Sequence, residues 1–410
     1  MTGERGAHGV ASPPRERAAS GGGAGWRLWV LGLGPLALLG VLVLAFLRLG
    51  PVGVFRAAFP PVEELTIERV VFPDPGRVEL RVVNGGPEPS TVAQVMVDEA
   101  YWPFAIEPGP ALARLGRATV RLEYPWVEGE PLHVRLVTST GLTFDRTVDV
   151  ATRSPRPDAV YLRTFTLLGA YAGVVPVLLG LLWYPFLGRL RPAGVHFALA
   201  VTAGLLLFLA VDALHEALEV AETLPSAFRG TALVALGVLG AVVVLFGLGR
   251  WLRPRSRGAG EGLRLATLVA LGIGLHNLGE GLAIGAAYAS GAIALGAFLV
   301  VGFAIHNTTE GFAIVAPIAR ERPRLAHLAA LGAVAGVPTI AGTWLGGFAY
   351  SPLATTVFLA VGAGAILQVV VEIARGVARE AGAGAVTARN AWGLLLGALV
   401  MYATALAVAA

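Results

Sequence analysis

The sequence predicts an all-α polytopic membrane bundle of eight transmembrane helices, preceded by one N-terminal transmembrane anchor and an extracytoplasmic β-sandwich domain. The first observation is composition: 55% of the 410 residues are hydrophobic and 14% are charged, where about a quarter of a soluble domain is charged. The second is a series of apolar runs after residue 156, each long enough to cross a bilayer. The third is a set of short alternating runs before them, a pattern typical of strands.

Composition also excludes several classes of chemistry. The chain has no Cys, so disulfides, thiolate metal sites and cysteine nucleophiles are all excluded. All 31 basic residues are Arg. A net charge of +4 and a pI near 9.7 could indicate nucleic acid, but in so apolar a chain they indicate Arg held in cytoplasmic loops. We therefore expect the lipid bilayer, and no nucleic acid, as a partner.

The start of the chain predicts a tail and an anchor. Residues 1–25 are rich in Gly, Ser, Pro, Ala and Arg, which is typical of a disordered tail, and we place this tail in the cytoplasm. Residues 26–50 include "WRLWVLGLGPLALLGVLVLAFLRL", which is long enough to span a bilayer. A secretory signal peptide is the alternative, but its apolar region would be only about 7–15 residues long and would end at a small-x-small cleavage site.

Residues 60–155 predict the β-sandwich. Runs such as "RVELRVVN" and "LHVRLVT" alternate apolar and polar residues, and "PDPG", "NGG" and "EGEP" supply turns between them. Several short strands at this spacing favour a small sandwich. The region holds one His, His133, and no cluster of metal-ligating residues. We therefore favour a docking or shielding module with an unknown partner over a metal-capture module.

Residues 158–410 are almost entirely apolar and predict the eight-helix domain. Gly, Pro and Arg lie at the short breaks between the apolar runs. The expected spans are 160–186, 195–222, 230–250, 264–288, 294–318, 325–349, 354–378 and 390–409. Arg gathers in alternate loops, as in "GRWLRPRSRG" and "ARERPR", and the positive-inside rule places these loops in the cytoplasm. The N-terminus is then cytoplasmic, while the β-domain and the C-terminus are extracytoplasmic.

Two stretches of the fourth and fifth spans nearly repeat each other: "LHNLGEGLAIGA" and "IHNTTEGFAIVA". Ionisable residues at membrane depth are costly, and they indicate function. In each copy the Glu lies four residues after the His and three after the Asn, so the three side chains share one helix face. The six residues are His276, Asn277, Glu280, His306, Asn307 and Glu310.

A turn centred near Ile293 would make the two helices antiparallel neighbours in a matching register. His276 then lies opposite Glu310, and Glu280 lies opposite His306. Two imidazoles and two carboxylates suit a divalent transition metal such as zinc, iron(II) or manganese, whereas calcium and magnesium favour all-oxygen cages. The alternative is a set of polar side chains that only hydrogen-bond the helices together. The second copy of the motif favours the metal.

Further polar residues lie at membrane depth and are candidate pathway residues. Asp212 and His215 lie in the second span, within "VDALHEALE". Gln368 and Glu372 lie in the seventh span.

At these residues the chain resembles the ZIP family of zinc and iron permeases, in particular its bacterial ZupT/GufA-like members, which carry H-N-x-P-E-G in their fourth and fifth helices. The resemblance covers about the last 250 residues, and the anchor and β-domain lie outside it. It implies eight spans, an external C-terminus and a place in the bacterial inner membrane. It also implies that a divalent metal ion is the substrate, with zinc favoured over iron or manganese. We further expect a homodimer.

Carried over to this chain, the resemblance implies two neighbouring metal sites. The two His and two Glu of the repeat would form the primary transport site, and the two Asn, sharing both carboxylates, would form half of the second. Asp212 and His215 match the polar second helix of the family and would line the pathway. Glu372 matches a position that is often acidic in the seventh helix.

The chain departs from the family pattern at three positions. Gly279 and Thr309 replace the Pro of the two motifs, which would free a carbonyl and bend each helix. Gly still allows a bend, and Thr can bond back to a carbonyl. Thr339, in "AGVPTIAGTWLGG" of the sixth span, replaces a Glu of the second site. We therefore expect one strong site and a weakened or absent second one.

The leading expectation is a permease, not an enzyme, that moves a divalent metal toward the cytoplasm. One alternative is a metal-dependent intramembrane hydrolase, in which zinc activates water; "HEALE" is the nearest match to HExxH, and it lacks the second His. The other alternative is a metal sensor or scaffold, in which the β-domain binds a partner and a degenerate transporter core reports metal.

Overall fold

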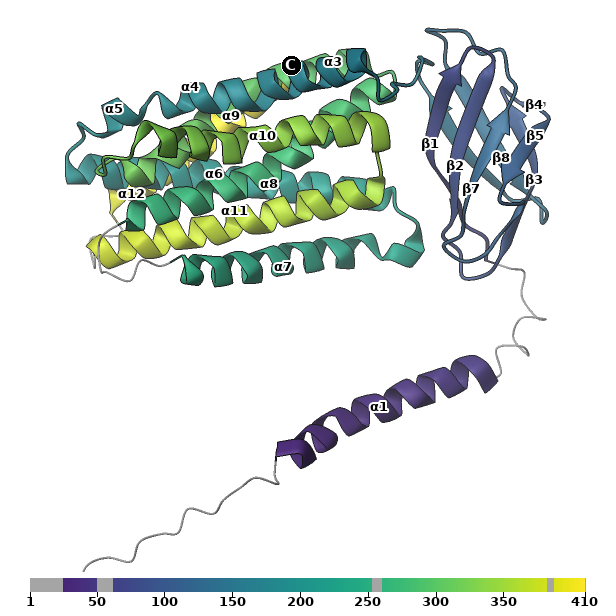
Figure 1. The fold of residues 1–410 in the computed structure, drawn as a ribbon, viewed down its shortest axis with the longest axis horizontal. Helices are drawn as coiled ribbons and strands as arrows, with labels where there is room; N and C mark the ends of the chain where they lie inside the picture. Colours follow the sequence, from purple (N-terminus) through teal and green to yellow (C-terminus); the bar gives the residue numbers. More distant parts are fainter. Residues whose placement is uncertain (1–24, 50–61, 253–259, 382–386, 410) are drawn as a thin grey trace, which may run out of the picture. The chain divides into compact units, whose positions relative to one another are not determined.

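The structure is a computed structural model, and it describes residues 25–49, 62–252, 260–381 and 387–409. The expected tail, residues 1–25, lies outside the described residues apart from Gly25. The chain forms two units, Met1–Pro61 and Val62–Ala410. The first unit contains α1 (Gly25–Leu49), an apolar helix of 25 residues (Figure 1). This helix coincides with the expected anchor, whose membrane role stays a prediction.

The second unit begins with a domain of two antiparallel sheets, as the sequence predicts. One sheet has the strand order β1-β2-β7-β5, and the other has the order β4-β3-β8-β9 with β6 paired to β3. The long strands coincide with the alternating runs, while the strands that the sequence did not predict are only two to four residues long. The strands are β1 (Leu65–Asp74), β2 (Arg77–Asn84), β3 (Ser90–Val97), β4 (Ala100–Tyr101), β5 (Phe104–Glu107), β6 (Ala111–Leu112), β7 (Arg117–Leu122), β8 (Leu132–Thr138) and β9 (Thr143–Val148).

Period-two alternation builds the core of this domain. Every second residue of β8 is buried, and the inward residues Val78, Leu80 and Val120 of the other sheet are fully buried. The inward residues of both sheets form one apolar cluster, with the rings of Phe72 and Trp126 packed at a centroid distance of 4.9 Å. Because a slip of one residue would turn this cluster to solvent, burial fixes the register.

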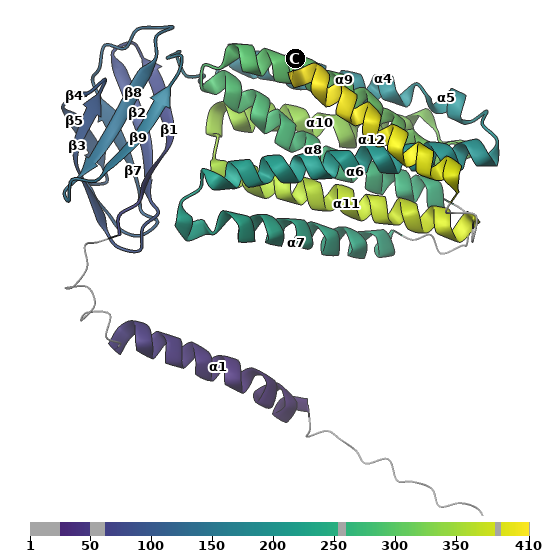
Figure 2. The ribbon, with the colours of Figure 1, turned by 180° about the vertical axis from the view of Figure 1, so that it is seen from behind.

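The rest of the second unit is a helical bundle whose long helices run side by side (Figures 1 and 2). Its first segment contains α3 (Ala159–Gly169), a π-helical turn (Ala170–Val174), α4 (Val175–Leu181) and α5 (Tyr184–Leu187). There follow α6 (Pro192–Glu222), a 3-10 turn (Ser226–Phe228), α7 (Gly230–Trp251) and α8 (Glu261–Ala289). The last helices are α9 (Ile293–Val315) with a 3-10 turn (Ala316–Ile318), α10 (Leu325–Ala349), α11 (Pro352–Ala381) and α12 (Ala388–Ala409).

Seven helical segments of the described chain are long and apolar enough to cross a membrane. They coincide with the first seven expected spans, from Ala159–Leu187 to Pro352–Arg379, with ends that differ by a few residues. The chain is therefore compatible with a multi-pass membrane bundle. The 22 residues of α12 coincide with the eighth expected span, whose crossing of the membrane stays a prediction.

The first bundle segment is not the continuous helix that the sequence predicts. A π-helical turn, Ala170–Val174, separates α3 from α4. Pro176 lies just after it and has no N–H, so the carbonyl of Ala172 loses its helical donor. The backbone widens at this point, and such π turns are frequent at functional sites.

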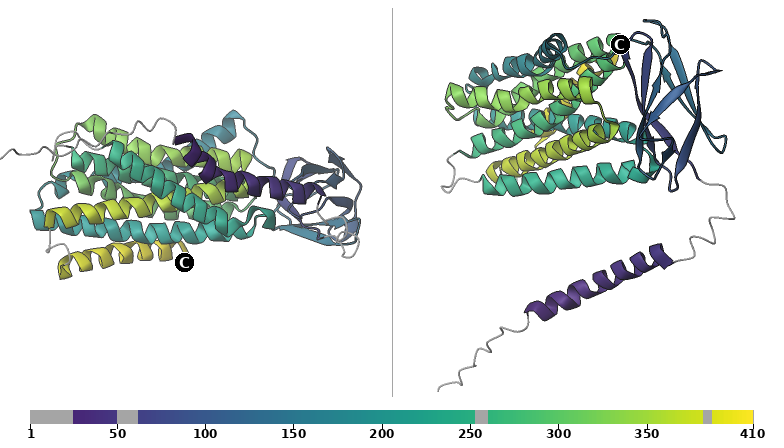
Figure 3. Two further views of the ribbon diagram at one scale, coloured as in Figure 1. Left: turned by 90° about the horizontal axis from the view of Figure 1, so that it is seen from below. Right: turned by 45° about the vertical axis from the view of Figure 1, so that its right-hand side comes forward.

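Among the seven segments of membrane-spanning length, helix α8 is the most deeply buried, and it packs against α9, α10 and α11. Figure 3 shows the bundle from two further sides. Glycines allow its close approach to α10. A Cβ added at Gly281, Gly285, Gly342 or Gly346 would lie 2.2 to 2.3 Å from a carbonyl oxygen of the partner helix. The two backbones therefore touch along this seam, as small residues permit in membrane bundles.

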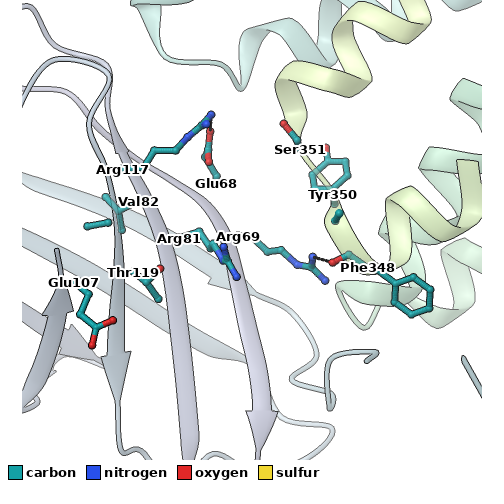
Figure 4. Close-up of a pocket in the computed structure, with 12 residues that line it drawn as sticks. Glu68, Arg69, Arg81, Val82, Glu107, Arg117, Thr119, Phe348, Tyr350 and Ser351 are labelled. Atoms are coloured by element: carbon teal, nitrogen blue, oxygen red, sulfur yellow. Dashed lines mark hydrogen bonds and ion pairs between the residues drawn. The ribbon is translucent and has the colours of Figure 1, made fainter. Parts of the chain in front are cut away.

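Hydrogen bonds also join the β-domain to the bundle. Arg69 of β1 donates to the carbonyls of Gly347 and Phe348 at the C-terminal end of α10, both at 3.2 Å (Figure 4). A guanidinium at this position complements the negative end of the helix dipole. Glu64 accepts from the amide of Ser226 at 2.7 Å and from its hydroxyl.

Candidate metal site

The candidate site lies in the α8–α9 hairpin, inside the bundle. Residues 276–280 belong to α8, residues 306–310 belong to α9, and a short turn at 290–292 joins the two helices. All six polar residues of the repeat are buried, with exposed fractions of 0 to 7%. The helical spacing therefore turns each set of three toward the interior.

Three of these side chains converge. His276 Nε2 lies 3.2 Å from Glu280 Oε1, and His306 Nε2 makes a short contact with the same oxygen. One ligand atom from each residue lies within 4.8 Å of the others, and no second group of three or more His, Asp or Glu gathers in this way among the described residues. Zinc bound at about 2.0–2.2 Å by nitrogen and oxygen holds its ligands at comparable spacing.

Glu310 does not pair with His276 as the hairpin register predicts. Glu280 does lie against His306 of the opposite helix, as expected. Glu310, however, accepts a hydrogen bond from Asn277 Nδ2 at 3.1 Å, while His276 turns to the Glu280 of its own helix. The reason is that an i, i+4 partner lies on the same helix face, so the pair within α8 forms in place of the pair across the hairpin.

The two Asn side chains make a crossed pair of contacts. Asn277 of α8 holds Glu310 of α9, and Asn307 of α9 donates to Glu280 Oε2 at 3.0 Å. Each amide thus fixes the carboxylate of the opposite helix. Hydrogen bonds to a ligating side chain fix its orientation and raise metal affinity.

Each Asn also donates to a carbonyl of a further helix. Asn307 Nδ2 bonds to Ala172 O at 2.9 Å, the carbonyl that Pro176 leaves without its helical donor. Asn277 Nδ2 of α8 donates at 3.2 Å to Ala335 O of α10, three residues before Pro338. Each of these carbonyls thus lies three or four residues before a proline of a neighbouring segment, whereas the repeat itself has no proline.

Local packing accounts for the two residues that replace the motif prolines. A Cβ at Gly279 would lie 2.7 Å from Leu359 Cδ2 of α11, so a larger residue would require the Leu359 side chain to move. Thr309 Oγ1 donates to the carbonyl of His306 at 2.7 Å, the back-bonding expected of Thr in a helix. Both helices stay continuous through the motif.

Several buried atoms of the site have no hydrogen-bond partner among the described residues. They are His276 Nδ1, Asn277 Oδ1, Asn307 Oδ1 and Glu310 Oε1. An unsatisfied buried polar group costs about 1–3 kcal/mol, and a buried carboxylate without a counter-charge costs more. Three of the four atoms are oxygens, which a bound cation would satisfy. The donor set therefore fits a divalent cation.

The other candidate residues of the bundle interior, Glu372, Gln368 and Thr339, are also buried. Glu372 is buried in an ion pair with Arg264, at 3.1 Å. Gln368 is buried with both amide atoms unpartnered among the described residues. Thr339 is buried, and its carbonyl oxygen packs against Gly281, but its hydroxyl has no hydrogen-bond partner in the described chain.

In α6 the structure shows a residue that the sequence analysis missed. Asp212 and His215 are exposed, and His215 pairs with Glu219 at 3.2 Å. Glu216 is half-buried instead, and it interacts electrostatically with His276. Glu216 follows Asp212 by four residues, so the sequence places both acidic residues on one face of α6. Which face of α6 packs toward the metal site cannot be read from that spacing.

No protein-family model matches the chain, and a search of curated proteins finds no match either.

Proposed function

We propose that this protein is a ZIP-type permease that moves a divalent transition metal, zinc foremost and iron or manganese as alternatives, toward the cytoplasm. The observation that carries the proposal is the buried group His276, Glu280 and His306. It is built from two copies of one motif on adjacent helices of membrane-spanning length. Side chains that only hydrogen-bond helices together would require neither a second copy of the motif nor three ligand atoms close to one point.

In this mechanism the metal ion is the substrate. It exchanges bound water for the two imidazole nitrogens and an oxygen of Glu280, while Asn307 keeps that carboxylate in place. Imidazole ligands favour transition metals over magnesium and calcium. Because the ligands must be deprotonated to bind metal, protonation on the cytoplasmic side favours release.

A second site on the same hairpin is weaker. The oxygens of Asn277, Asn307 and Glu310 that lack a hydrogen-bond partner would supply an oxygen-only ligand set, which holds transition metals less well than imidazole does. Thr339 has a hydroxyl at the position where ZIP proteins have a carboxylate, so the second ligand set lacks one negative charge. We propose one strong site and a weak neighbour.

The proposed topology follows the distribution of Arg. We propose nine crossings of the bacterial inner membrane, with α1 as the anchor and the bundle supplying the other eight. The Arg-rich loops face the cytoplasm, and the β-domain and the C-terminus face outward. In the proposed homodimer each protomer carries a complete site, because all six residues belong to one hairpin.

Metal uptake into proteoliposomes tests the proposal. Glu280→Ala removes the carboxylate that both imidazoles contact, so we expect the initial rate of zinc uptake to fall about 100-fold or more, at or beyond the loss seen for outer-shell partners. Glu310→Ala removes a carboxylate that contacts Asn277, and we expect a loss of about tenfold. His327→Ala, an exposed His at the start of α10, is the matched control and keeps the wild-type rate. Wild-type rates of zinc uptake by both Glu variants would contradict the assignment of the metal site.

One observation favours a second candidate function. Two imidazoles and one carboxylate, next to a second carboxylate with a free oxygen, would also suit a catalytic zinc ion. An intramembrane hydrolase would bind zinc without transporting it and would turn over a lipid or peptide. The uptake assay distinguishes the two, because a hydrolase leaves the vesicle lumen free of zinc.

A further inference from the structure

A cavity of about 410 Å³ lies where the β-domain meets one end of the helical bundle (Figure 4). One wall is the outer face of the sheet β1-β2-β7-β5. The other wall is formed by residues 348–351, at the junction of α10 and α11. None of the residues that line it belongs to the candidate metal site, so the proposed transport leaves this cavity without a role.

A row of directly opposed residues crosses the sheet at this wall. Arg69 of β1 lies opposite Arg81 of β2, which in turn lies opposite Thr119 of β7. Thr119 lies opposite Glu107 of β5, and all four residues line the cavity. Like charges that lie directly opposite each other destabilise a sheet. The two neighbouring guanidiniums therefore cost free energy unless an anion lies between them.

The carboxylates at this wall do not supply that anion. Glu68 and Glu107 also line the cavity, but Glu68 pairs with Arg117 at 3.2 Å and Glu107 pairs with Arg121 at 2.6 Å. Neither of the two opposed Arg residues of the row has an ion-pair partner among the described residues. The cavity is thus left with two uncompensated positive charges.

One of these two Arg residues is fixed in place and the other is free to bind. Arg69 donates to the carbonyls of Gly347 and Phe348, which uses two of its five N–H groups. Burial, together with the charge of Arg81, lowers the pKa of the Arg69 guanidinium. Arg81 is exposed, and its side chain makes no hydrogen bond to the described residues. An exposed Arg is ordinary on a protein surface, but one placed opposite a second Arg at a cavity indicates an anion site.

Three hydroxyl groups add further donors to the cavity, and they belong to Thr119, Tyr350 and Ser351. The first two have no hydrogen-bond partner among the described residues. Ser351 Oγ accepts from the amide of Ala354 at 3.4 Å, which leaves its own O–H to donate. Guanidinium groups with several hydroxyls suit a phosphate group, because its oxygens accept many hydrogen bonds and Arg matches its geometry.

The position of the cavity along the bundle makes phosphate available to it. Helix α10 ends at Ala349 and α11 begins at Pro352, and both segments are long and apolar enough to cross a membrane. In a bilayer that both helices cross, residues 350–351 lie near the level of the lipid headgroups. A phospholipid headgroup and a free phosphate ion present the same chemistry to the two Arg residues.

We propose that this cavity binds a phosphate group between Arg69 and Arg81, with hydrogen bonds from the hydroxyls of Thr119, Tyr350 and Ser351. The two Arg residues and Thr119 come from the sheet, and the other two residues come from the bundle. The bound phosphate removes the repulsion between the guanidiniums and joins the β-domain to the bundle. This site does not depend on metal transport.

Equilibrium dialysis of radiolabelled inorganic phosphate against the purified full chain in detergent tests one source. We expect Arg81→Gln to weaken phosphate binding about tenfold or more, because it removes a charged donor. Arg77→Gln is the matched control: it is an exposed Arg on the same face of β2, four residues away and outside this cavity. It should keep the wild-type affinity. Equal losses in both variants would overturn the site.

Arg81→Glu covers the case in which Arg81→Gln fails to fold. It places a carboxylate directly opposite Arg69, so a cross-strand ion pair replaces the repulsion between like charges. We expect this variant to melt at a higher temperature than the wild type without phosphate, and to bind no phosphate. A variant that melts no higher than the wild type, or binds phosphate as tightly, would contradict the proposal.

Native mass spectrometry tests the lipid source. Phosphatidylglycerol is added to the full chain, with a diacylglycerol of the same acyl chains, which has no phosphate, as the control. Phosphatidylglycerol retained by the wild type but lost from Arg81→Gln assigns the site to a headgroup, and binding of inorganic phosphate alone assigns it to the free ion. If neither ligand depends on Arg81, the proposal is wrong. No arm measures metal, so failure of the proposed permease leaves these results unchanged.

Discussion

The two Glu residues of the repeat have the same motif position but different surroundings. Glu280 contacts both imidazoles and Asn307, whereas Glu310 contacts Asn277 and keeps one oxygen free. The difference arises because His276 turns to the Glu of its own helix. In the proposed mechanism Glu280 would therefore be the centre of the strong site, and Glu310 would belong to its weaker neighbour.

A second residue, Asp74, sets a pH response outside the membrane-spanning segments. It lies at the end of β1 and pairs with Arg156 at 2.8 Å and with Arg153 at 3.2 Å, in the segment that leads to α3. The hydrogen bond from Arg156, with the charges of nearby Arg residues, holds the pKa of the Asp74 carboxyl below its usual range. A depressed pKa means that these contacts stabilise the fold above pH 3.8, the ordinary value, and weaken as the pH falls through the folded value.

We therefore predict that acid loosens the segment after β9. The backbone amide of Ser154, which donates to Phe72 O at 3.0 Å, should lose hydrogen-exchange protection as the pH falls below about 4. In Asp74→Asn the Ser154 amide should be less protected from hydrogen exchange already at neutral pH, and its protection should change less as the pH falls. The exposed Asp149→Asn is the control and should follow the wild type. Identical profiles for Asp74→Asn and the wild type would refute this role.

At the scale of secondary-structure elements, the α8–α10 seam holds the site-bearing helix in place. Gly281 and Gly342 face each other closely enough that a Cβ on Gly342 would lie 2.3 Å from Leu278 O. We predict that Gly342→Ala lowers the free energy of unfolding by about 1–3 kcal/mol, because the added methyl forces the backbones apart. Gly240→Ala on α7 meets nothing within 4 Å and should leave stability unchanged. Thermal unfolding in detergent measures both; equal melting temperatures would contradict the seam.

The helices were predictable because each is a long apolar run bounded by Arg, Gly or Pro. The π turn Ala170–Val174 was not, because a Pro in an apolar run predicts a bend without specifying its form. The strands β4 and β6 were missed because two residues carry no alternation. Hydrophobic periodicity along the sequence thus predicts helices and strands of ordinary length. It fails where hydrogen bonds to another element determine the backbone conformation.

At the scale of the whole molecule, the sequence predicted which residues meet but not all of their partners. Hairpin register correctly placed Glu280 against His306, because two antiparallel helices with one turn have a fixed pairing. It did not predict the crossed Asn contacts, because His276 turns to Glu280 and leaves Glu310 to Asn277. It did not predict Glu216 either, since that residue's place depends on how a third helix, α6, packs. Arg264 was missed because Arg near a loop is ordinarily cytoplasmic and exposed.

The central claim is that this bundle carries a transition metal through a buried site of two imidazoles and a carboxylate. Metal-resolved uptake tests it most directly: proteoliposomes receive zinc, manganese and magnesium at equal concentrations, and mass spectrometry measures the metals inside. We predict that zinc accumulates above the level in protein-free vesicles while magnesium does not, because imidazole ligands select against magnesium. Magnesium entering as fast as zinc, or no metal entering above the protein-free level, would contradict it.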